Sequence, residues 1–359
     1  MNSARFRIIA GSLFYLSSLC LLRQFPLGAP FIGFGGLMII SGFDYFDFIR
    51  LLAAAVVVSI PDPRMKLAVL GLLLLDGSRG RLKSDEASIG WTLLLASRIV
   101  ADSSRISNDM GALTGIFGVF LLAGIWPISW SWLRTDEPWG RRISRSLIGL
   151  YLLYDLVQRF YPLAFDTWAP LILFLPIIGI IWASGLLISG RCDAAPYRML
   201  VSFETQLLAI FILSVRSIDE SLFALAFWSL LLSIACIWSA TRREGCYSRG
   251  MMTRLIGLGG VATILAVPIL AGFPYRWLAL SALLFSSPAG FAGFLIGMIL
   301  LPLTLRPIQD QLRSATPGAS LIAAILALGG SIFIGIVPGL VALSSEAVTI
   351  WSFLMRSVR

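Results

Sequence analysis

Apolar segments of about the length that crosses a lipid bilayer follow one another along this chain. A membrane-spanning α-helix needs roughly 20 predominantly apolar residues. Clear runs lie at 110–133, 169–189, 199–215, 221–241, 252–272, 277–303 and 318–343. Shorter or interrupted runs lie at 8–22, 25–41, 48–60, 66–75, 87–101 and 146–159. This succession predicts an all-α fold, a polytopic transmembrane helical bundle of about 13–14 helices.

The two shortest of these runs, 48–60 and 66–75, are only marginally long enough to span. Pro61-Asp62-Pro63 stands between them. Proline and aspartate at this spacing favour a turn. We therefore expect a tight helical hairpin or a pair of segments partly buried in protein.

The composition requires lipid contact. Apolar residues make up 58% of the chain and charged residues 13%, which is about half the charged share of typical soluble domains. A soluble protein of 359 residues could not bury that much apolar surface in its interior. We expect a multi-pass integral protein of a bacterial cytoplasmic (inner) membrane, with lipids among its partners.

The basic residues are concentrated in alternate loops. Loops 76–86, 134–146, 190–198 and 242–254 are rich in arginine, and the intervening loops 160–168, 216–220 and 273–276 carry few or mixed charges. By the positive-inside rule the basic loops and the N-terminus are cytoplasmic. This pattern explains the net charge of +9 without nucleic acid, so we expect no nucleic-acid partner.

Several kinds of chemistry are excluded by residues that the chain lacks. It has no histidine, which removes histidine-ligated haem, zinc and copper and any histidine general base. Its four cysteines form no CxxC motif and no even-spaced framework. No loop exceeds about 15 residues, too few for a soluble catalytic domain. We therefore expect no cofactor, no metal site and no catalytic residue.

Ionisable residues inside apolar runs are the candidates for function, because placing a charge in a bilayer is costly. Glu204 is the strongest, since its own run holds no opposite charge, and Gln206 lies beside it. A hydrogen-bonded structural role is the alternative for Glu204. Arg98 and Arg276 lie near the ends of their runs, where a long side chain can also reach the interface.

Asp155 is the second acidic candidate. It lies in the run 146–159, with Arg145 near the cytoplasmic end of the same run. The alternative is a simple ion pair with Arg159, four residues further along the helix.

Helix-breaking residues interrupt several otherwise apolar runs: Pro176, Pro268, Ser286-Ser287-Pro288 and Pro338. Transporters use broken helices where backbone groups line a polar cavity. Proline also occurs in ordinary membrane helices, so the breaks predict the site only weakly.

Several segments together resemble one family, the antiporter-like membrane subunits of respiratory complex I, membrane-bound hydrogenases and Mrp-type cation/proton antiporters. Pro268-Ile-Leu-Ala-Gly272-Phe273-Pro-Tyr-Arg276 is similar to the P-x-x-A-G-F-x-x-K end of the family's eleventh helix. Gly149-Leu-Tyr151 resembles the seventh helix, and Asp193 to Ser202, followed by Gln206, resembles the entry into the ninth. Trp126 to Leu133 resembles the P-x-H-x-W-L segment, and Gly335-Ile-Val-Pro338 resembles the end of the thirteenth helix.

The order and spacing of these motifs agree with the family from about 110 to 343. The resemblance implies an antiporter-like core at 110–343, with inverted repeats and broken helices. Residues 1–109 match only as hydrophobic segments and predict an abbreviated, divergent set of N-terminal helices. Residues 344–359 predict an amphipathic or short C-terminal helix.

The chain departs from the family where the family moves protons. Leu147 stands at the position of a buried lysine, with Arg145 one half-turn before it, and Ser229 and Ser233 stand near a histidine and a lysine of the tenth helix. The run 277–303 holds no charge, and Glu86 is the nearest residue to the fifth-helix glutamate. Arginine does not release its proton at physiological pH, and serine does not titrate there.

We therefore expect a divergent, non-pumping antiporter-like subunit of a complex I-like assembly (NADH dehydrogenase, hydrogenase or Mrp type), partnered by other integral membrane subunits and not catalytic by itself. The Gly-rich segments 33–36, 255–260 and 289–297 predict close helix contact with neighbours. The alternative is a stand-alone secondary transporter that uses intramembrane carboxylates and arginines. A membrane enzyme acting on lipid-linked substrates fits least, because no paired carboxylates accompany the arginines of 134–145.

Overall fold

A computed structural model of the chain describes residues 3–21, 24–41, 45–78, 85–101, 105–125, 139–160, 168–189, 196–215, 218, 220–241, 258–259, 261–263, 265, 267, 270, 272–314, 322–323 and 325–336. These residues are almost entirely helical. The labelled elements are α1 (Ser3–Leu21), α2 (Ala29–Ile40), α3 (Tyr45–Val58), α4 (Pro63–Ser78), α5 (Asp85–Ala101), α6 (Arg105–Ala123), α7 (Trp139–Asp155), the π-helical turn η2 (Leu156–Phe160), α8 (Ala169–Ile172), α9 (Phe174–Ser189), α10 (Pro196–Ser214), α11 (Glu220–Thr241), α13 (Gly272–Ser286) and α14 (Pro288–Ser314).

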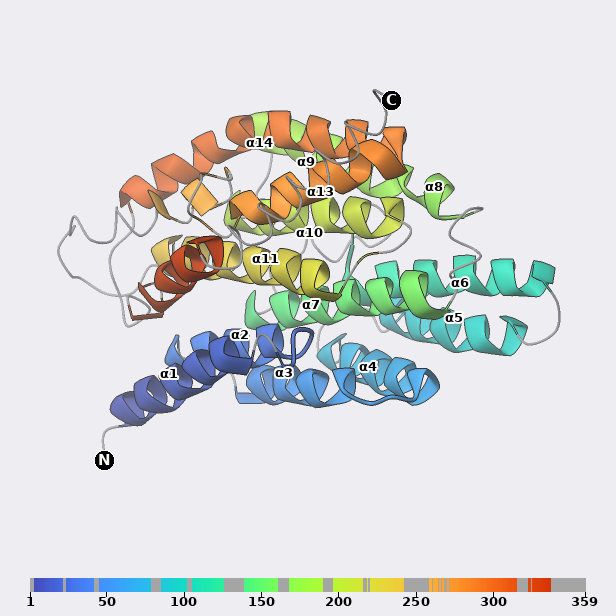
Figure 1. The fold of residues 1–359 in the computed structure, drawn as a ribbon, viewed down its shortest axis with the longest axis horizontal. Helices are drawn as coiled ribbons and strands as arrows, with labels where there is room; N and C mark the ends of the chain where they lie inside the picture. Colours follow the sequence, from blue (N-terminus) through green and yellow to red (C-terminus); the bar gives the residue numbers. More distant parts are fainter. Residues whose placement is uncertain are drawn as a thin grey trace, which may run out of the picture.

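The all-helical prediction is confirmed for the described residues. Helices α3 and α4 are joined by the turn at Pro61-Asp62 and lie nearly end to end in Figure 1, so they do not form a tight hairpin. Both are partly buried against the rest of the bundle, which is the other arrangement expected for these short segments. Asp62 begins α4, because its carboxylate accepts a hydrogen bond from the Arg64 backbone N–H at 2.9 Å.

The predicted break at Ser286-Ser287-Pro288 is confirmed: the run 277–303 is divided at Ser287 between α13 and α14, because Pro288 lacks the N–H that would continue the helix. Helices α8 and α9 are also separated, at Leu173, three residues before Pro176.

Two predicted boundaries are wrong. The loop predicted at 273–276 is helical, and Gly272 and Phe273 begin α13 instead of ending the preceding span. The loop predicted at 134–146 is helical from Trp139 onward, so the arginines of 141–145 belong to α7.

Helices α7 and α10 lie at the centre of the bundle (Figure 1). Helix α7 contacts α3, α4, α6 and α10, and α10 contacts α7, α9, α11, α13 and α14. In the view of Figure 1 the helices α1–α4 lie along one side, α9, α13 and α14 along the other, and the pair α5–α6 lies at one end. Arg142, Arg145 and Asp155 of α7 and Glu204 of α10 are therefore buried among neighbouring helices.

Two helical hairpins are held by glycines that meet backbone to backbone. A Cβ added to Gly11 of α1 would lie 2.5 Å from the carbonyl oxygen of Gly36 in α2, and a Cβ on Gly36 would lie 2.6 Å from the carbonyl oxygen of Gly11. Gly90 of α5 and Gly118 of α6 approach in the same reciprocal way, at 3.0 and 2.7 Å. Any side chain at these four positions would push the helices apart.

The predicted glycine faces make contacts within this chain. Gly33 lies against Trp228 and Ser18, and Gly36 lies against α1. The glycines of 289–297 (Gly290, Gly293 and Gly297) lie against α9 and α10. These two segments therefore give no support to contact with neighbouring subunits, which corrects the sequence prediction. Within 255–260 the structure describes only 258–259, where Gly259 meets Leu328.

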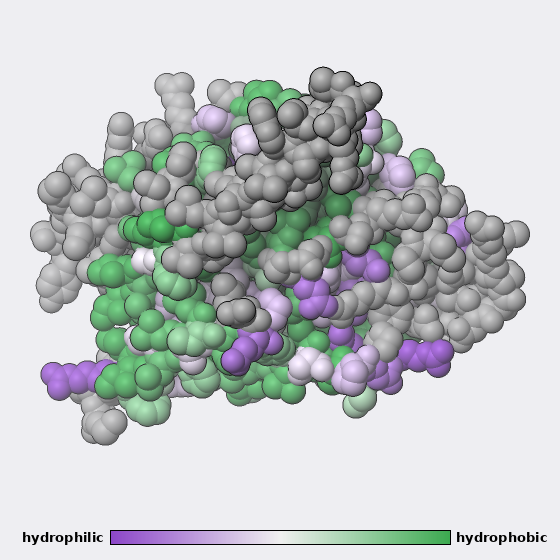
Figure 2. Space-filling view, in the orientation of Figure 1, coloured by the Kyte–Doolittle hydropathy of each residue, from purple (hydrophilic) through white to green (hydrophobic). Residues whose placement is uncertain are grey.

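Large apolar side chains point outward from the peripheral helices. On α1 they form a stripe at helical spacing, each at least half exposed: Phe6, Ile9, Leu13 and Leu16. A second stripe runs along α8 and α9: Leu171, Phe174, Ile178, Ile181, Trp182 and Ile188. Figure 2 shows apolar surface gathered over the region of α1–α3. Among the helices that the structure describes, none combines the length and the apolar character needed to cross a membrane.

Candidate functional site

Glu204 of α10 and Arg276 of α13 form a buried ion pair. Arg276 Nη2 donates a hydrogen bond to Glu204 Oε1, and its Nη1 donates to the sulfur of Met298 in α14 at 3.1 Å. The side chains are only 5% and 3% exposed. The structure thus joins two residues that the sequence identified separately. The interfacial alternative for Arg276 is wrong, because the guanidinium lies inside the bundle.

Helix packing places this pair. Helix α10 carries Glu204 on the side that faces α13 and α14, and Tyr275 beside Arg276 is held by edge-on aromatic contacts with Phe211 of α10 and Phe294 of α14, at centroid distances of 6.2 and 6.3 Å. The phenol hydroxyl of Tyr275 and the Nε of Arg276 are buried without a hydrogen-bond partner. Three helices therefore meet around one ion pair and a small number of polar atoms.

Lys66 of α4 and Asp155 of α7 form a second buried pair. Lys66 Nζ lies 3.9 Å from Asp155 Oδ1, and the two side chains are 5% and 0% exposed. The sequence identified Asp155 but not Lys66. The available signal was that Lys66 is one of only two lysines among 28 basic residues and begins an apolar run. The side chain of Arg159, the alternative partner of Asp155, lies outside the described residues.

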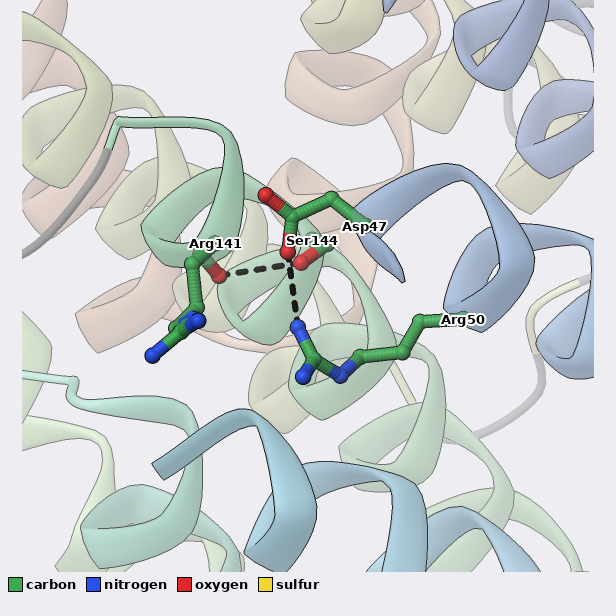
Figure 3. Close-up of polar contacts among 4 residues, drawn as sticks. All are labelled: Asp47, Arg50, Arg141 and Ser144. Atoms are coloured by element: carbon green, nitrogen blue, oxygen red, sulfur yellow. Dashed lines mark hydrogen bonds and ion pairs between the residues drawn. The ribbon is translucent and has the colours of Figure 1, made fainter. Parts of the chain in front are cut away.

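A third charged group lies where α3 meets the start of α7. Asp47 Oδ1 accepts a hydrogen bond from Arg50 Nη1 at 2.7 Å within α3. Figure 3 shows this pair beside the first turns of α7, where Ser144 Oγ donates to the Arg141 carbonyl oxygen at 2.9 Å. The candidate Arg145 is buried on α7 as well. Asp47 and Arg50 were missed because an i,i+3 pair at the start of a run resembles an ordinary interfacial pair.

The other predicted residues lie apart from these pairs. Gln206 is buried but turns to α9, where its side chain meets Gly179, and it donates to Ser202 Oγ at 3.2 Å. It is not part of the Glu204 centre. Leu147 is fully buried in the apolar core of α7, and Ser229 is buried in α11. The side chains of Arg98 and Ser233, and all of Pro268 and Pro338, lie outside the described residues.

The family-motif residues on α7 and α13 have packing roles. A Cβ on Gly149 would lie 2.1 Å from the Cβ of Ala123, so this glycine permits close approach of α6 and α7. Tyr151 is buried among Phe31, Tyr154 and Phe223. A Cβ on Gly272 would lie 1.8 Å from the carbonyl oxygen of Thr263, and Phe273 stacks on Trp277. These motif positions therefore fix the fold.

The three ion pairs differ in what they can do chemically. Arginine keeps its proton, so in the Glu204–Arg276 and Asp47–Arg50 pairs only the carboxylate can change its protonation state. In the Lys66–Asp155 pair both partners can exchange a proton. No three metal-binding side chains are grouped together among the described residues.

The geometry defines a class: an all-helical bundle with broken helices and ion pairs buried at its centre. Comparison with solved structures agrees with the resemblance seen in the sequence. The fold is similar to a chain in the Mrp complex from Dietzia sp. DQ12-45-1b, with a TM-score of 0.62, 11% identity, and coverage of 88% of this chain and 76% of that one. It is also similar to a chain of respiratory complex I from Thermus thermophilus with bound NADH, with a TM-score of 0.61, 14% identity, and coverage of 94% and 95%.

The antiporter-like fold predicted from the sequence is thus confirmed. No family model matches the sequence, and no curated protein matches it. The likeness is therefore one of fold.

Proposed function

We propose that the chain is an antiporter-like integral membrane subunit of a multi-subunit, complex I-like ion-translocating assembly of the NADH dehydrogenase, hydrogenase or Mrp type. One observation carries this proposal: the fold similarity to a chain of respiratory complex I extends over 94% of this chain and 95% of the other. Similarity over two whole chains supports the same kind of place in an assembly more strongly than a shared substructure would.

The outward apolar stripes support a bilayer location. On α1 and on α8–α9 the exposed side is apolar, while the charged pairs Glu204–Arg276 and Lys66–Asp155 lie inside. A soluble bundle has the reverse arrangement, with charged side chains outside. Lipids and other membrane subunits are the partners that such a surface fits.

We further propose that the role is structural and that the family-style proton path is degenerate. Glu204 is bound by an arginine, which does not give up its proton. Leu147 is enclosed in apolar core where the family has a lysine. The strongest candidate carboxylate is therefore held by a permanent cation, and the position of one family lysine carries no titratable group.

The domain organisation expected from the sequence belongs to this proposal. It comprises abbreviated N-terminal helices at 1–109, an antiporter-like core at 110–343 and a short C-terminal helix at 344–359. Contacts of α3 and α4 with α7 support one continuous bundle across the first boundary.

The test is purification of the affinity-tagged chain from its native membrane in mild detergent, followed by identification of what purifies with it. Antiporter-like membrane subunits in a stable complex are expected. An unrelated multi-pass protein with the same tag controls for adventitious capture. A chain that runs as a stable monomer, with no such subunits, contradicts the proposal.

The Lys66–Asp155 pair favours a second candidate, the stand-alone secondary transporter, because both of its partners can exchange a proton. The purified chain is reconstituted in liposomes and proton flux is measured. The structural role predicts no flux above that of empty liposomes. Flux that disappears in Asp155→Asn and persists in Gly185→Ala would replace the structural role with transport.

A further inference from the structure

The helix that carries Asp155 changes its geometry immediately after that residue. Helix α7 ends at Asp155 and continues as the π-helical turn Leu156–Phe160. A π-turn is rare and is found mostly as a single turn inserted in an α-helix, frequently at functional sites. Its position here, adjoining a buried ion pair, is the first observation.

The second observation is that side chains in and just before the π-turn form hydrogen bonds with the backbone at the end of α10. Gln158 Nε2 donates a hydrogen bond to the Val215 carbonyl oxygen at 2.8 Å, and Gln158 Oε1 accepts one from the Ile218 N–H at 3.2 Å. Tyr154 Oη donates to the Ile218 carbonyl oxygen at 3.2 Å. Val215 and Ile218 follow the last residue of α10, where backbone groups lack partners within the helix.

The π-turn gives Asp155 and Gln158 different directions. In a regular α-helix two residues three positions apart project from nearly the same side. The wider π-turn rotates the chain less per residue and so separates the two directions further. Asp155 consequently faces Lys66 of α4, while Gln158 faces the end of α10.

We propose that Gln158 and Tyr154 are positioning residues that couple the Lys66–Asp155 pair to helix α10. The π-turn and a regular α-turn are two discrete arrangements of the same segment. A change in the charge of Asp155 alters its attraction to Lys66 and so shifts α7 where the π-turn begins. The hydrogen bonds of Gln158 and Tyr154 to Val215 and Ile218 transmit this shift to α10. The other half of α10 bears Glu204, so the two buried pairs are linked through one helix.

This inference goes beyond the proposed function and does not depend on it, because it concerns a single chain and can be tested without any partner. It also differs from a plain helix cap. A cap stabilises the end of α10 whatever the state of Asp155, whereas a coupling residue makes the end of α10 respond to Asp155.

The experiment measures amide hydrogen exchange of the full chain in mild detergent, over the peptide that covers 211–218. Asp155→Asn is expected to speed exchange there about tenfold, because the hydrogen bonds at this helix end open more often. Gln158→Met, which keeps the side-chain length, is expected to speed exchange to a similar extent. The double variant is expected to show no further increase over Gln158→Met alone.

Two controls make the result specific. Thr205→Val removes a side-chain hydrogen bond that α10 makes only with itself, so the response to Asp155→Asn should persist in that background. Gln158→Glu keeps the acceptor for Ile218 but loses the donor to Val215, so an intermediate response is expected. Circular dichroism and size-exclusion profiles identify any variant that does not fold.

The proposal is overturned if Asp155→Asn leaves exchange over 211–218 unchanged. It is equally overturned if the full effect of Asp155→Asn remains in the folded Gln158→Met background, since the π-turn would then cap α10 without transmitting anything.

Discussion

Replacing Glu204 by glutamine leaves the positive charge of Arg276 buried at the centre of three helices without its counter-charge. Glutamine has nearly the same shape, so packing of α10 against α13 is preserved and the change is electrostatic. The reciprocal variant, Arg276→Met, keeps the aliphatic stem and leaves the Glu204 carboxylate uncompensated. The double variant Glu204→Gln/Arg276→Met removes both charges.

The magnitude follows from the burial of the pair. Opposite unit charges about 4 Å apart interact by about 4 kcal/mol at an effective dielectric constant of about 20. Loss of one partner of a buried pair costs about 3–5 kcal/mol, while loss of both is often close to neutral. We expect each single variant to lower the free energy of unfolding by about 3–4 kcal/mol and the double variant by about 1–2 kcal/mol, so that the coupling energy is about 5 kcal/mol.

The assay is reversible unfolding of the purified chain, by titrating a denaturing detergent into mixed micelles and following tryptophan fluorescence. The matched control is Ser202→Ala with Arg276→Met, because Ser202 lies on α10 but bonds to Gln206 and not to Arg276. That control pair should be additive within about 0.5 kcal/mol. If the effects of the Glu204 and Arg276 variants on the free energy of unfolding were also additive, the two residues would have no measurable interaction energy, which would refute the reasoning.

Two further predictions concern the remaining contacts. Lys66→Met is expected to destabilise the chain by about 2–4 kcal/mol, and Asp155→Asn in the same chain should restore part of the loss, as measured by the same titration; a larger loss in the double variant would contradict the pairing. Gly272→Ala is expected to prevent native packing, because its Cβ would lie 1.8 Å from the Thr263 carbonyl oxygen, whereas Gly185→Ala, with nothing within 4 Å, should be neutral or stabilise by up to about 1 kcal/mol. The yield of folded protein and the unfolding midpoint are measured for both variants. Equal losses in Gly272→Ala and Gly185→Ala would refute the close packing described at Gly272.

The sequence predicted the helical elements well where a long apolar run carried the signal, because burial in lipid and burial in protein demand the same residues. It failed at the ends of helices, where the observed boundaries differ from the predicted ones. The helix that begins at Trp139 has three charged residues in its first two turns, and hydropathy assigns such a stretch to a loop. By contrast, the division of the run 277–303 was predicted from Ser286-Ser287-Pro288, because a proline lacks the N–H that would continue the helix.

The sequence predicted individual residues of the site but not which of them form ion pairs with each other. Glu204, Arg276 and Asp155 are conspicuous because each is a charge in an apolar run. Their pairing depends on which helices are neighbours, and no local periodicity reports that. Lys66 was overlooked for a related reason: a lysine at the start of a marginal run has an obvious interfacial interpretation, and its partner is about 90 residues away in the chain. The π-turn at 156–160 was not predicted, and the residues to which it hydrogen-bonds, Val215 and Ile218, lie 57 and 60 residues away from Gln158 in the chain.

The long separation of the paired charges has a consequence for how such a chain is made. Glu204 and Arg276 are 72 residues apart. Synthesis proceeds at about 5–20 residues per second, so Arg276 is added to the chain roughly 4–15 seconds after Glu204. In the bilayer location proposed above, a helix bearing an uncompensated carboxylate enters lipid poorly. During that interval α10 needs shelter beside α7, α9 or the insertion machinery, so the order in which helices leave the ribosome and dock is part of how this bundle acquires a charged centre.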